Sequence, residues 1–148
     1  MPPQAYDIVI VGGGPAGLAA GLYAARARRK TVLLEKGVIG GQIALTELVE
    51  NYPGVPSVNG FDLAQTMLKQ AESYGLETQF AAVTALEQEG KRWLVRTAED
   101  EYVGKAVIVT AGDARQNAAR QVVSSASDGA TAAIAAEHYL SSNFAAEE

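Results

Sequence analysis

The sequence predicts an α/β fold built on a parallel sheet. Short apolar runs at residues 8–11, 31–34 and 106–109 have the length and composition of buried parallel strands. An alanine-rich segment at 15–29 follows the first run and is expected to form a helix. Turn residues divide the segment 83–103 into three short strands, which indicate a small antiparallel β-meander. Together these elements predict a Rossmann-like three-layer domain.

The first strand runs directly into a turn with glycines at the spacing G-x-G-x-x-G. Gly12 allows a tight reversal of the chain, Gly14 lets a pyrophosphate approach the backbone, and Gly17 lets the next helix pack closely on the strand. The start of that helix offers unpaired N–H groups and a partial positive charge to phosphates. The turn predicts a dinucleotide site; the alternative is a glycine-rich turn of an unrelated α/β protein.

An acidic residue supports the dinucleotide hypothesis. Glu35 ends the second apolar run, 23 residues after Gly12, at the position where an acid holds the hydroxyls of a dinucleotide ribose. Because a carboxylate there would repel a 2′-phosphate, the sequence favours FAD or NAD over NADP.

The composition excludes several kinds of function. At 148 residues the chain has the size of one domain, and its net charge of −5 argues against nucleic acid or an anionic membrane surface as a partner. No apolar run reaches the length of a membrane-spanning helix, and the N-terminus lacks the basic region of a signal peptide, so a cytoplasmic protein is expected. The sequence has no cysteine and one histidine, which excludes disulfides and dithiol redox centres and argues against a zinc site.

Further elements complete the predicted domain. A long irregular connection at 36–60 is interpreted as functional, because loops of this length inside compact domains usually have a function. A helix is expected at 61–74 and a strand at 77–80. A last helix is expected at 128–140 after a polar segment, with a frayed tail at 141–148.

Three polar side chains outside the glycine turn are candidate ligands. Gln42 and Asn51 lie in the long connection and can both donate and accept hydrogen bonds, as a flavin edge requires, although turn residues are the alternative reading of each. Asp113 follows the apolar run at 106–109, so its carboxylate is expected at the carboxyl edge of the sheet, where ligands bind in this fold.

Four stretches resemble the FAD-binding domain of the low-molecular-weight thioredoxin reductases and their flavoprotein relatives. They are YDIVIVGGGPAGLAAGLYAARA at 6–27, GGQIALTELVENYPG at 40–54, KAVIVTAG at 105–112 and GDARQNAARQVVSSASDGATAAIAAEHYL at 112–140. The middle two are much more specific than a glycine fingerprint. The resemblance implies a single FAD-binding domain over residues 1–148, in which 6–112 matches the first half of the family's domain and 113–140 its last segment.

The resemblance also implies where FAD would contact the chain, with no metal and no catalytic residue. The residues implied for the pyrophosphate and adenosine are Gly12, Gly14, Pro15, Ala16, Gly17, Glu35, Lys36, Ala82 and Val83. The residues implied along the ribityl chain and flavin are Gly41, Gln42, Asn51, Thr110, Ala111, Gly112, Asp113, Arg120, Gln121 and Val122. A cation near the flavin would stabilise negative charge on its reduced form.

The chain departs from this family at one junction. Family members carry a second dinucleotide domain, with an NADPH site and a Cys-x-x-Cys pair, between the two halves of the FAD domain. Here Gly112 runs directly into Asp113, and the sequence has no second glycine fingerprint. Two strands of the family are expected to be merged, which would displace Asp113, and Ser127 replaces a common glycine just before the last helix. An engineered excision is favoured over a natural one.

Three hypotheses follow for the function. The first is an FAD-binding module derived from a thioredoxin reductase-like enzyme, without its own NADPH domain and redox disulfide. The second is a small flavin oxidoreductase or diaphorase that takes hydride from free NAD(P)H. The third is a truncated fold that binds only the adenosine half of FAD, or nothing. The resemblance also suggests a homodimer, because the FAD domains make the dimer contact in the family.

Overall fold

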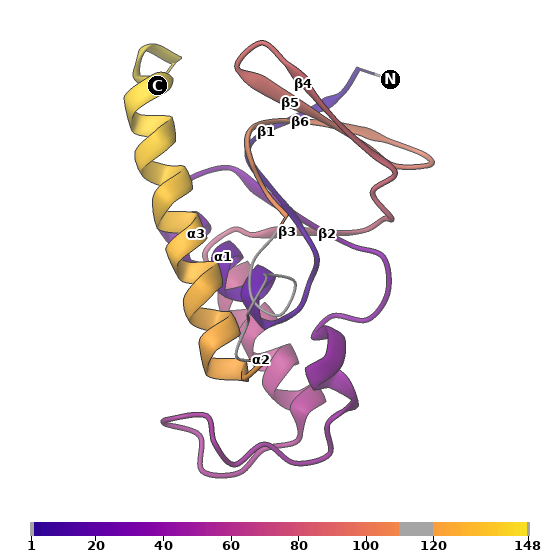
Figure 1. Cartoon of the computed structure of the whole chain (residues 1–148), viewed down its shortest axis with the longest axis vertical. Coiled ribbons are helices and arrows are strands. Elements are labelled where there is room, and N and C mark those ends of the chain that lie inside the picture. Colours follow the sequence, from indigo (N-terminus) through magenta and orange to yellow (C-terminus); the bar gives the residue numbers. More distant parts are fainter. Residues whose placement is uncertain (1, 110–119, 148) are drawn as a thin grey trace.

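The computed structural model describes residues 2–109 and 120–147, which form a sheet covered by helices. Figure 1 shows α3 running alongside α1, while the β4–β5 hairpin lies at the end of the molecule away from α2. The helices and strands are β1 (Gln4–Val11), α1 (Pro15–Arg26), β2 (Thr31–Glu35), the 3₁₀ helix η1 (Gly41–Leu45), α2 (Gly60–Glu72), β3 (Glu77–Phe80), β4 (Ala85–Glu89), β5 (Arg92–Arg96), β6 (Glu101–Ile108), α3 (Val122–Asn143) and the 3₁₀ helix η3 (Ala145–Glu147).

The sheet has six strands in the order β3-β2-β1-β6-β5-β4. β3, β2, β1 and β6 are parallel, and β6, β5 and β4 are antiparallel. Ile8 is paired with Thr31 on one side and with Ala106 on the other, so β1 is the central strand of the parallel part. The parallel sheet and the antiparallel meander that the sequence predicts are both confirmed.

Apolar side chains fill both faces of the parallel strands. Because successive side chains of a strand point to opposite faces, β1 and β2 contribute to two cores. The core beneath the helices includes Ile8, Ile10, Leu18, Leu33, Leu63, Ala133 and Leu140. The core on the other face includes Tyr6, Val9, Val32, Leu34, Val95 and Tyr102. Helices, parallel sheet and meander therefore form the three predicted layers.

One prediction about the strands is wrong. The sequence predicts separate strands at 101–103 and 106–109, whereas the structure has the single strand β6. Its first half pairs with β5, and it pairs with β1 from Tyr102 to Ile108. Gly104 lies within this continuous strand, where a Cβ would be only 3.0 Å from Val9 Cγ2 on β1. The glycine permits close packing between the strands.

The boundaries of two helices also differ from the prediction. α1 ends at Arg26 rather than at residue 29, and Arg28 adopts a left-handed conformation with φ of 60°. α3 begins at Val122, six residues before the predicted start, with the N–H of Gln121 donating to Ser124 Oγ. Ser127 therefore lies inside α3 rather than in a turn before it.

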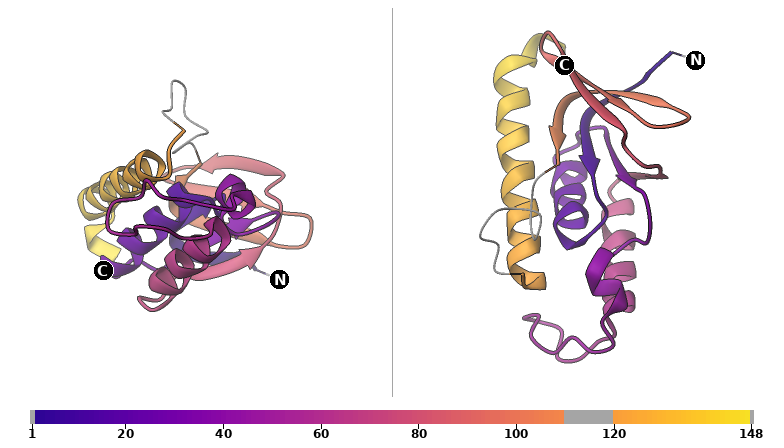
Figure 2. Two further views of the ribbon diagram at one scale, coloured as in Figure 1. Left: turned by 90° about the horizontal axis from the view of Figure 1, so that it is seen from below. Right: turned by 45° about the vertical axis from the view of Figure 1, so that its right-hand side comes forward.

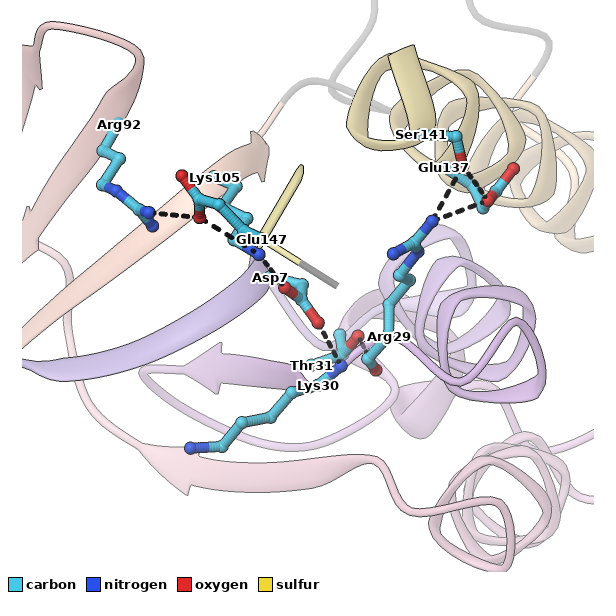
Figure 3. Close-up of polar contacts among 9 residues, drawn as sticks. All are labelled: Asp7, Arg29, Lys30, Thr31, Arg92, Lys105, Glu137, Ser141 and Glu147. Carbon is cyan, nitrogen blue, oxygen red and sulfur yellow. Dashed lines mark hydrogen bonds and ion pairs between the residues drawn. The ribbon is translucent and has the colours of Figure 1, made fainter. Parts of the chain in front are cut away.

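Residues 141–147 are ordered by contacts with the sheet, so the predicted fraying is wrong for this described part of the tail. α3 continues to Asn143, and the ring of Phe144 is buried. Cζ of Arg92 and Nζ of Lys105 each lie 5.5 Å from the centre of that ring. Glu147 Oε2 lies 2.6 Å from Arg92 Nη2 and 3.6 Å from Lys105 Nζ, as Figure 3 shows.

The charged cluster formed by Arg92, Lys105 and Glu147 also contacts β1. Lys105 Nζ lies 2.9 Å from Asp7 Oδ1, while Asp7 Oδ2 accepts a hydrogen bond from the backbone N–H of Lys30 at 2.9 Å (Figure 3). Burial alone would raise the pKa of Asp7, but the ammonium and the N–H group outweigh it and hold the pKa below its ordinary value.

No helix among residues 2–109 and 120–147 is long and apolar enough to cross a membrane.

Candidate functional site

A cavity of about 490 Å³ lies at the carboxyl ends of β1 and β6. It lies between the glycine turn, the first turns of α1 and α3, and the segment from η1 to residue 51. Its lining residues are Ile10, Val11, Gly12, Gly14, Pro15, Ala16, Gly17, Gln42, Ile43, Thr46, Leu48, Val49, Asn51, Ile108, Val109, Arg120, Gln121, Val122 and Ser125. Open α/β sheets bind ligands at this edge.

The glycine turn is closed on one side and open on the other. Gly12 has φ of 106°, a conformation that favours glycine, and its N–H donates to the carbonyl of Leu34 at 2.8 Å. A side chain at Gly17 would overlap the carbonyl oxygen of Gly12, so the third residue of α1 must be a glycine. A Cβ at Gly14 would meet nothing within 4 Å. The backbone at Gly14 is therefore accessible from the cavity.

The first turn of α1 favours an anion. Pro15 occupies the first helical position, where a missing N–H has no cost. The N–H groups of Ala16 and Gly17 precede the first intrahelical hydrogen bond, which Leu18 donates to the carbonyl of Gly14 at 2.9 Å. Unpaired N–H groups and the helix dipole together bind phosphates.

Another part of the cavity combines apolar walls with two amides. Ile43, Val49 and Ile108 contribute buried apolar side chains. Asn51 Nδ2 donates to Gln121 Oε1 at 2.9 Å, which joins the loop before α2 to the first turn of α3. Figure 2 shows this loop beside the start of α3. An apolar wall with a few fixed hydrogen-bonding groups suits a planar heterocycle.

The predicted acid lies next to the glycine turn but does not line the cavity. Glu35 Oε2 accepts a hydrogen bond from the N–H of Gly13 at 2.6 Å, and Oε1 accepts one from the N–H of Gly37 at 2.7 Å. Its backbone carbonyl accepts a hydrogen bond from Ala81 at 3.0 Å. The segment after β3 is therefore fixed beside Glu35.

Most of the predicted cofactor residues within the described ranges meet at this cavity. Ten line it: Gly12, Gly14, Pro15, Ala16, Gly17, Gln42, Asn51, Arg120, Gln121 and Val122. Gly41 lies beside the turn, since a Cβ there would be 3.7 Å from the Cα of Gly14. Lys36 and Ala82 are exposed outside the lining, and Val83 packs on the core beneath the meander. Thr110, Ala111, Gly112 and Asp113 lie outside the described residues.

Sequence reasoning missed nine further residues of the cavity lining, seven of them apolar. The additional residues are Ile10, Val11, Ile43, Thr46, Leu48, Val49, Ile108, Val109 and Ser125. Those at the ends of β1 and β6 could have been found from the rule that ligands bind at the carboxyl ends of parallel strands. Ser125 lies one helical turn after Gln121, but the predicted start of α3 was too late to reveal this.

The site has the chemistry that a dinucleotide requires. An accessible glycine backbone and an unpaired helix N-terminus suit its phosphates, and Arg120 adds a cation to the lining. The apolar wall and the amides of Asn51 and Gln121 suit a ring system with polar edges. The residues present therefore fit a dinucleotide that carries an aromatic ring at each end.

Comparison with known proteins shows the family. The model of the pyridine nucleotide-disulphide oxidoreductase family matches residues 6–141. The chain belongs to this family. Thioredoxin reductase of Bacillus subtilis (strain 168) is 41% identical over 108 residues, 72% of this chain and 34% of the relative. Thioredoxin reductase of Peptoclostridium litorale is 47% identical over 108 residues, with the same shares.

Solved structures of this family have the same fold. The crystal structure of Lactococcus lactis thioredoxin reductase (FR conformation) has a TM-score of 0.69 at 42% identity, covering 72% of this chain and 35% of that one. The structure of thioredoxin reductase from Streptococcus pyogenes MGAS5005 has a TM-score of 0.71 at 37% identity. The match covers 75% of this chain and 36% of that one. The family assignment confirms FAD as the predicted cofactor. The chain spans about a third of the length of the curated relatives it matches.

Proposed function

We propose that residues 1–148 act as a single module that holds one FAD non-covalently in the cavity at the carboxyl ends of β1 and β6. One observation carries this proposal: the glycine turn at the start of α1 and the start of α3 line the same cavity, although they are far apart in sequence. The family's FAD motifs come from these same segments.

The residues have separate roles in this proposal. The open backbone at Gly14 and the N–H groups of Ala16 and Gly17 hold the pyrophosphate. Glu35 faces the adenosine ribose, and Lys36, Ala82 and Val83 lie along the adenosine part. Gly41 lies where the pyrophosphate meets the ribityl chain. These assignments follow the order of the family motifs along the chain.

The flavin part of the cofactor is assigned to the apolar region of the cavity. Asn51 and Gln121 supply donors and acceptors for the ring edge, with Gln42 and Val122 beside them. Arg120 adds a positive charge that stabilises a reduced, anionic flavin. Bound FAD would supply two-electron redox chemistry, while the chain's own residues bind and orient it.

Electron exchange in this proposal depends on an outside donor. The sequence has no cysteine and one glycine fingerprint, so these residues supply no disulfide and no second dinucleotide site. Hydride transfer requires the nicotinamide to be held close to the flavin, and no residue of the sequence is assigned to that task. We infer that this is a cytoplasmic redox module that arose by an engineered excision. We also infer that it forms a homodimer, because the FAD domains make the dimer contact in the family.

The first experiment is an absorption spectrum of the purified protein, followed by release and quantification of the flavin. A flavin spectrum with about one FAD per chain is expected. A colourless protein that takes up no added FAD would contradict the proposal. If FAD is bound, NADPH oxidation with a micromolar KM would instead favour the diaphorase alternative over a binding module.

A further inference from the structure

Glu35 accepts two hydrogen bonds from within the protein, in addition to the ribose contact proposed for it. Its carboxylate joins two loops, because one oxygen accepts the N–H of Gly13 in the turn after β1 and the other accepts the N–H of Gly37 after β2. The donor–acceptor distances are 2.6 Å and 2.7 Å. Hydrogen bonds from N–H groups to an ionised carboxylate are about twice as strong as those between neutral groups.

Gly13 is held from several directions. Its N–H donates to Glu35, and its carbonyl accepts the N–H of Gly40 at 2.7 Å. A Cβ at Gly13 would lie 3.2 Å from both Cβ and Oε2 of Glu35 and 2.8 Å from Cδ1 of Ile39. A side chain at this position, which the fingerprint leaves free, would therefore have to displace the end of the Ile39 side chain and shift Glu35.

The carboxylate therefore fixes the middle of the turn and leaves its neighbour free. A Cβ at Gly14 would meet nothing within 4 Å, and Gly14 lines the cavity. An ionised carboxylate has about four lone-pair sites, and the two N–H groups use two of them. The same group can shape the turn and still accept hydroxyl donors.

We propose that Glu35 is a positioning residue for the glycine turn, and that its bond to Gly13 sets the shape of the phosphate site independently of any contact with ribose. The proposal rests on the proposed FAD function for its effect on affinity. It does not rest on that function for the effect on the turn itself. Preorganisation of this kind raises affinity because less ordering remains for the ligand to impose.

The test uses Glu35→Gln, which keeps the size of the side chain but removes its charge and one acceptor. In protein freed of cofactor, hydrogen exchange at the Gly13 amide should accelerate at least about tenfold, because its partner becomes a weaker acceptor. Equal exchange at Gly13 in wild type and variant would overturn the proposal. This measurement involves no cofactor, so it stands even if the protein fails to bind FAD.

A pair of ligands separates positioning from ribose binding. FAD and FMN both carry a flavin and phosphate, but FMN lacks the adenosine ribose. Glu35→Gln should weaken FMN by roughly tenfold, which corresponds to about 1.4 kcal/mol, and should weaken FAD by at least as much, because FAD also loses the ribose contact. A loss confined to FAD would overturn the proposal and leave Glu35 as a ribose ligand only.

Controls guard against a general loss of folding. Glu89→Gln makes the same chemical change at an exposed position in β4, remote from the turn, and should leave Gly13 exchange and both affinities unchanged. Glu35→Asp keeps the charge on a shorter side chain and should restore part of the Gly13 protection. If Glu35→Gln speeds exchange equally throughout the sheet, the role is one of global stability and the positioning proposal is wrong.

Discussion

Gly129 of α3 packs directly against the backbone of Ala16 in the first turn of α1. A Cβ at Gly129 would overlap the carbonyl oxygen of Ala16 and lie 2.9 Å from its Cα. Because Ala16 also lines the cavity, this contact sets the separation between the two helices at the candidate cofactor site.

Gly129→Ala should therefore destabilise the protein, although alanine is the better helix former. At an unconstrained helix position the change would stabilise by about 1 kcal/mol. Here overpacking should outweigh that gain and leave a net loss of about 1–2 kcal/mol in the free energy of unfolding, measured by urea denaturation. Ser127→Ala, at an exposed position of the same helix, should be neutral or stabilising. A more stable Gly129→Ala protein would mean that the two helices are further apart.

Substitutions at two glycines of the same turn should affect different properties, one the affinity for FAD and the other the stability of the fold. Gly14→Val places a side chain where the structure has open space, so the folding transition should change little while FAD affinity falls by at least about tenfold. Gly17→Ala would overlap the carbonyl oxygen of Gly12, so it should lower the thermal midpoint itself. Flavin titration and thermal denaturation of both variants check the contrast. Unchanged flavin content in Gly14→Val would place the cofactor elsewhere.

Because of the ion pair of Asp7 and Lys105, part of the free energy of unfolding should depend on pH in the acid range. The pKa of Asp7 is lowered in the folded protein, so the ionised form contributes stability that is complete above its unfolded pKa of about 3.9. This contribution is lost as the pH falls through the lower folded pKa. Asp7→Asn keeps an acceptor for the Lys30 N–H and removes the charge, and should cost about 1–2 kcal/mol at pH 7.

The difference between wild type and Asp7→Asn should shrink progressively below about pH 4, as measured by urea unfolding across the acid range. Glu89→Gln, with its carboxylate exposed on β4, serves as the charge control. A difference that stayed constant from pH 7 to pH 3 would show that the charge of Asp7 contributes nothing.

Phe144 should contribute more to stability than its place near the end of the chain suggests. Phe144 is 4% exposed, whereas Phe80 is 72% exposed. Phe144→Ala should therefore cost about 3 kcal/mol, while Phe80→Ala should cost less than about 0.5 kcal/mol. Similar losses for both variants in chemical denaturation would show that the tail does not hold its position on the sheet.

The parts of the fold that depend on local patterns could be predicted from the sequence. The runs at 8–11 and 31–34 are apolar throughout, and buried parallel strands require this. The glycine turn is specified by three residues within one short segment, so its geometry follows from spacing alone. The start of α3 was harder, because its first turns contain serine and alanine with weak periodicity and are fixed by packing on α1.

The site was predicted in the same uneven way. Gly12, Gly14 and Gly17 are recognisable by type, whereas Ile43 and Ile108 line the cavity only because the fold brings η1 and β6 together. The local sequence around an apolar residue predicts that it is buried, but it does not predict which distant residues it will contact. The order of the tail likewise depends on Phe144 reaching Arg92 across the sheet.

The arrangement of the two chain ends has a practical consequence for tethering. β1 begins at the edge of the sheet opposite the cavity, and the chain ends beyond the last turn of α3, whose first turn lines the cavity. The 22 residues of α3 span about 33 Å at 1.5 Å per residue. A redox group attached beside the start of β1 or the last turn of α3 would therefore lie at the end of the molecule away from the cavity, about the length of α3 from a cofactor bound there.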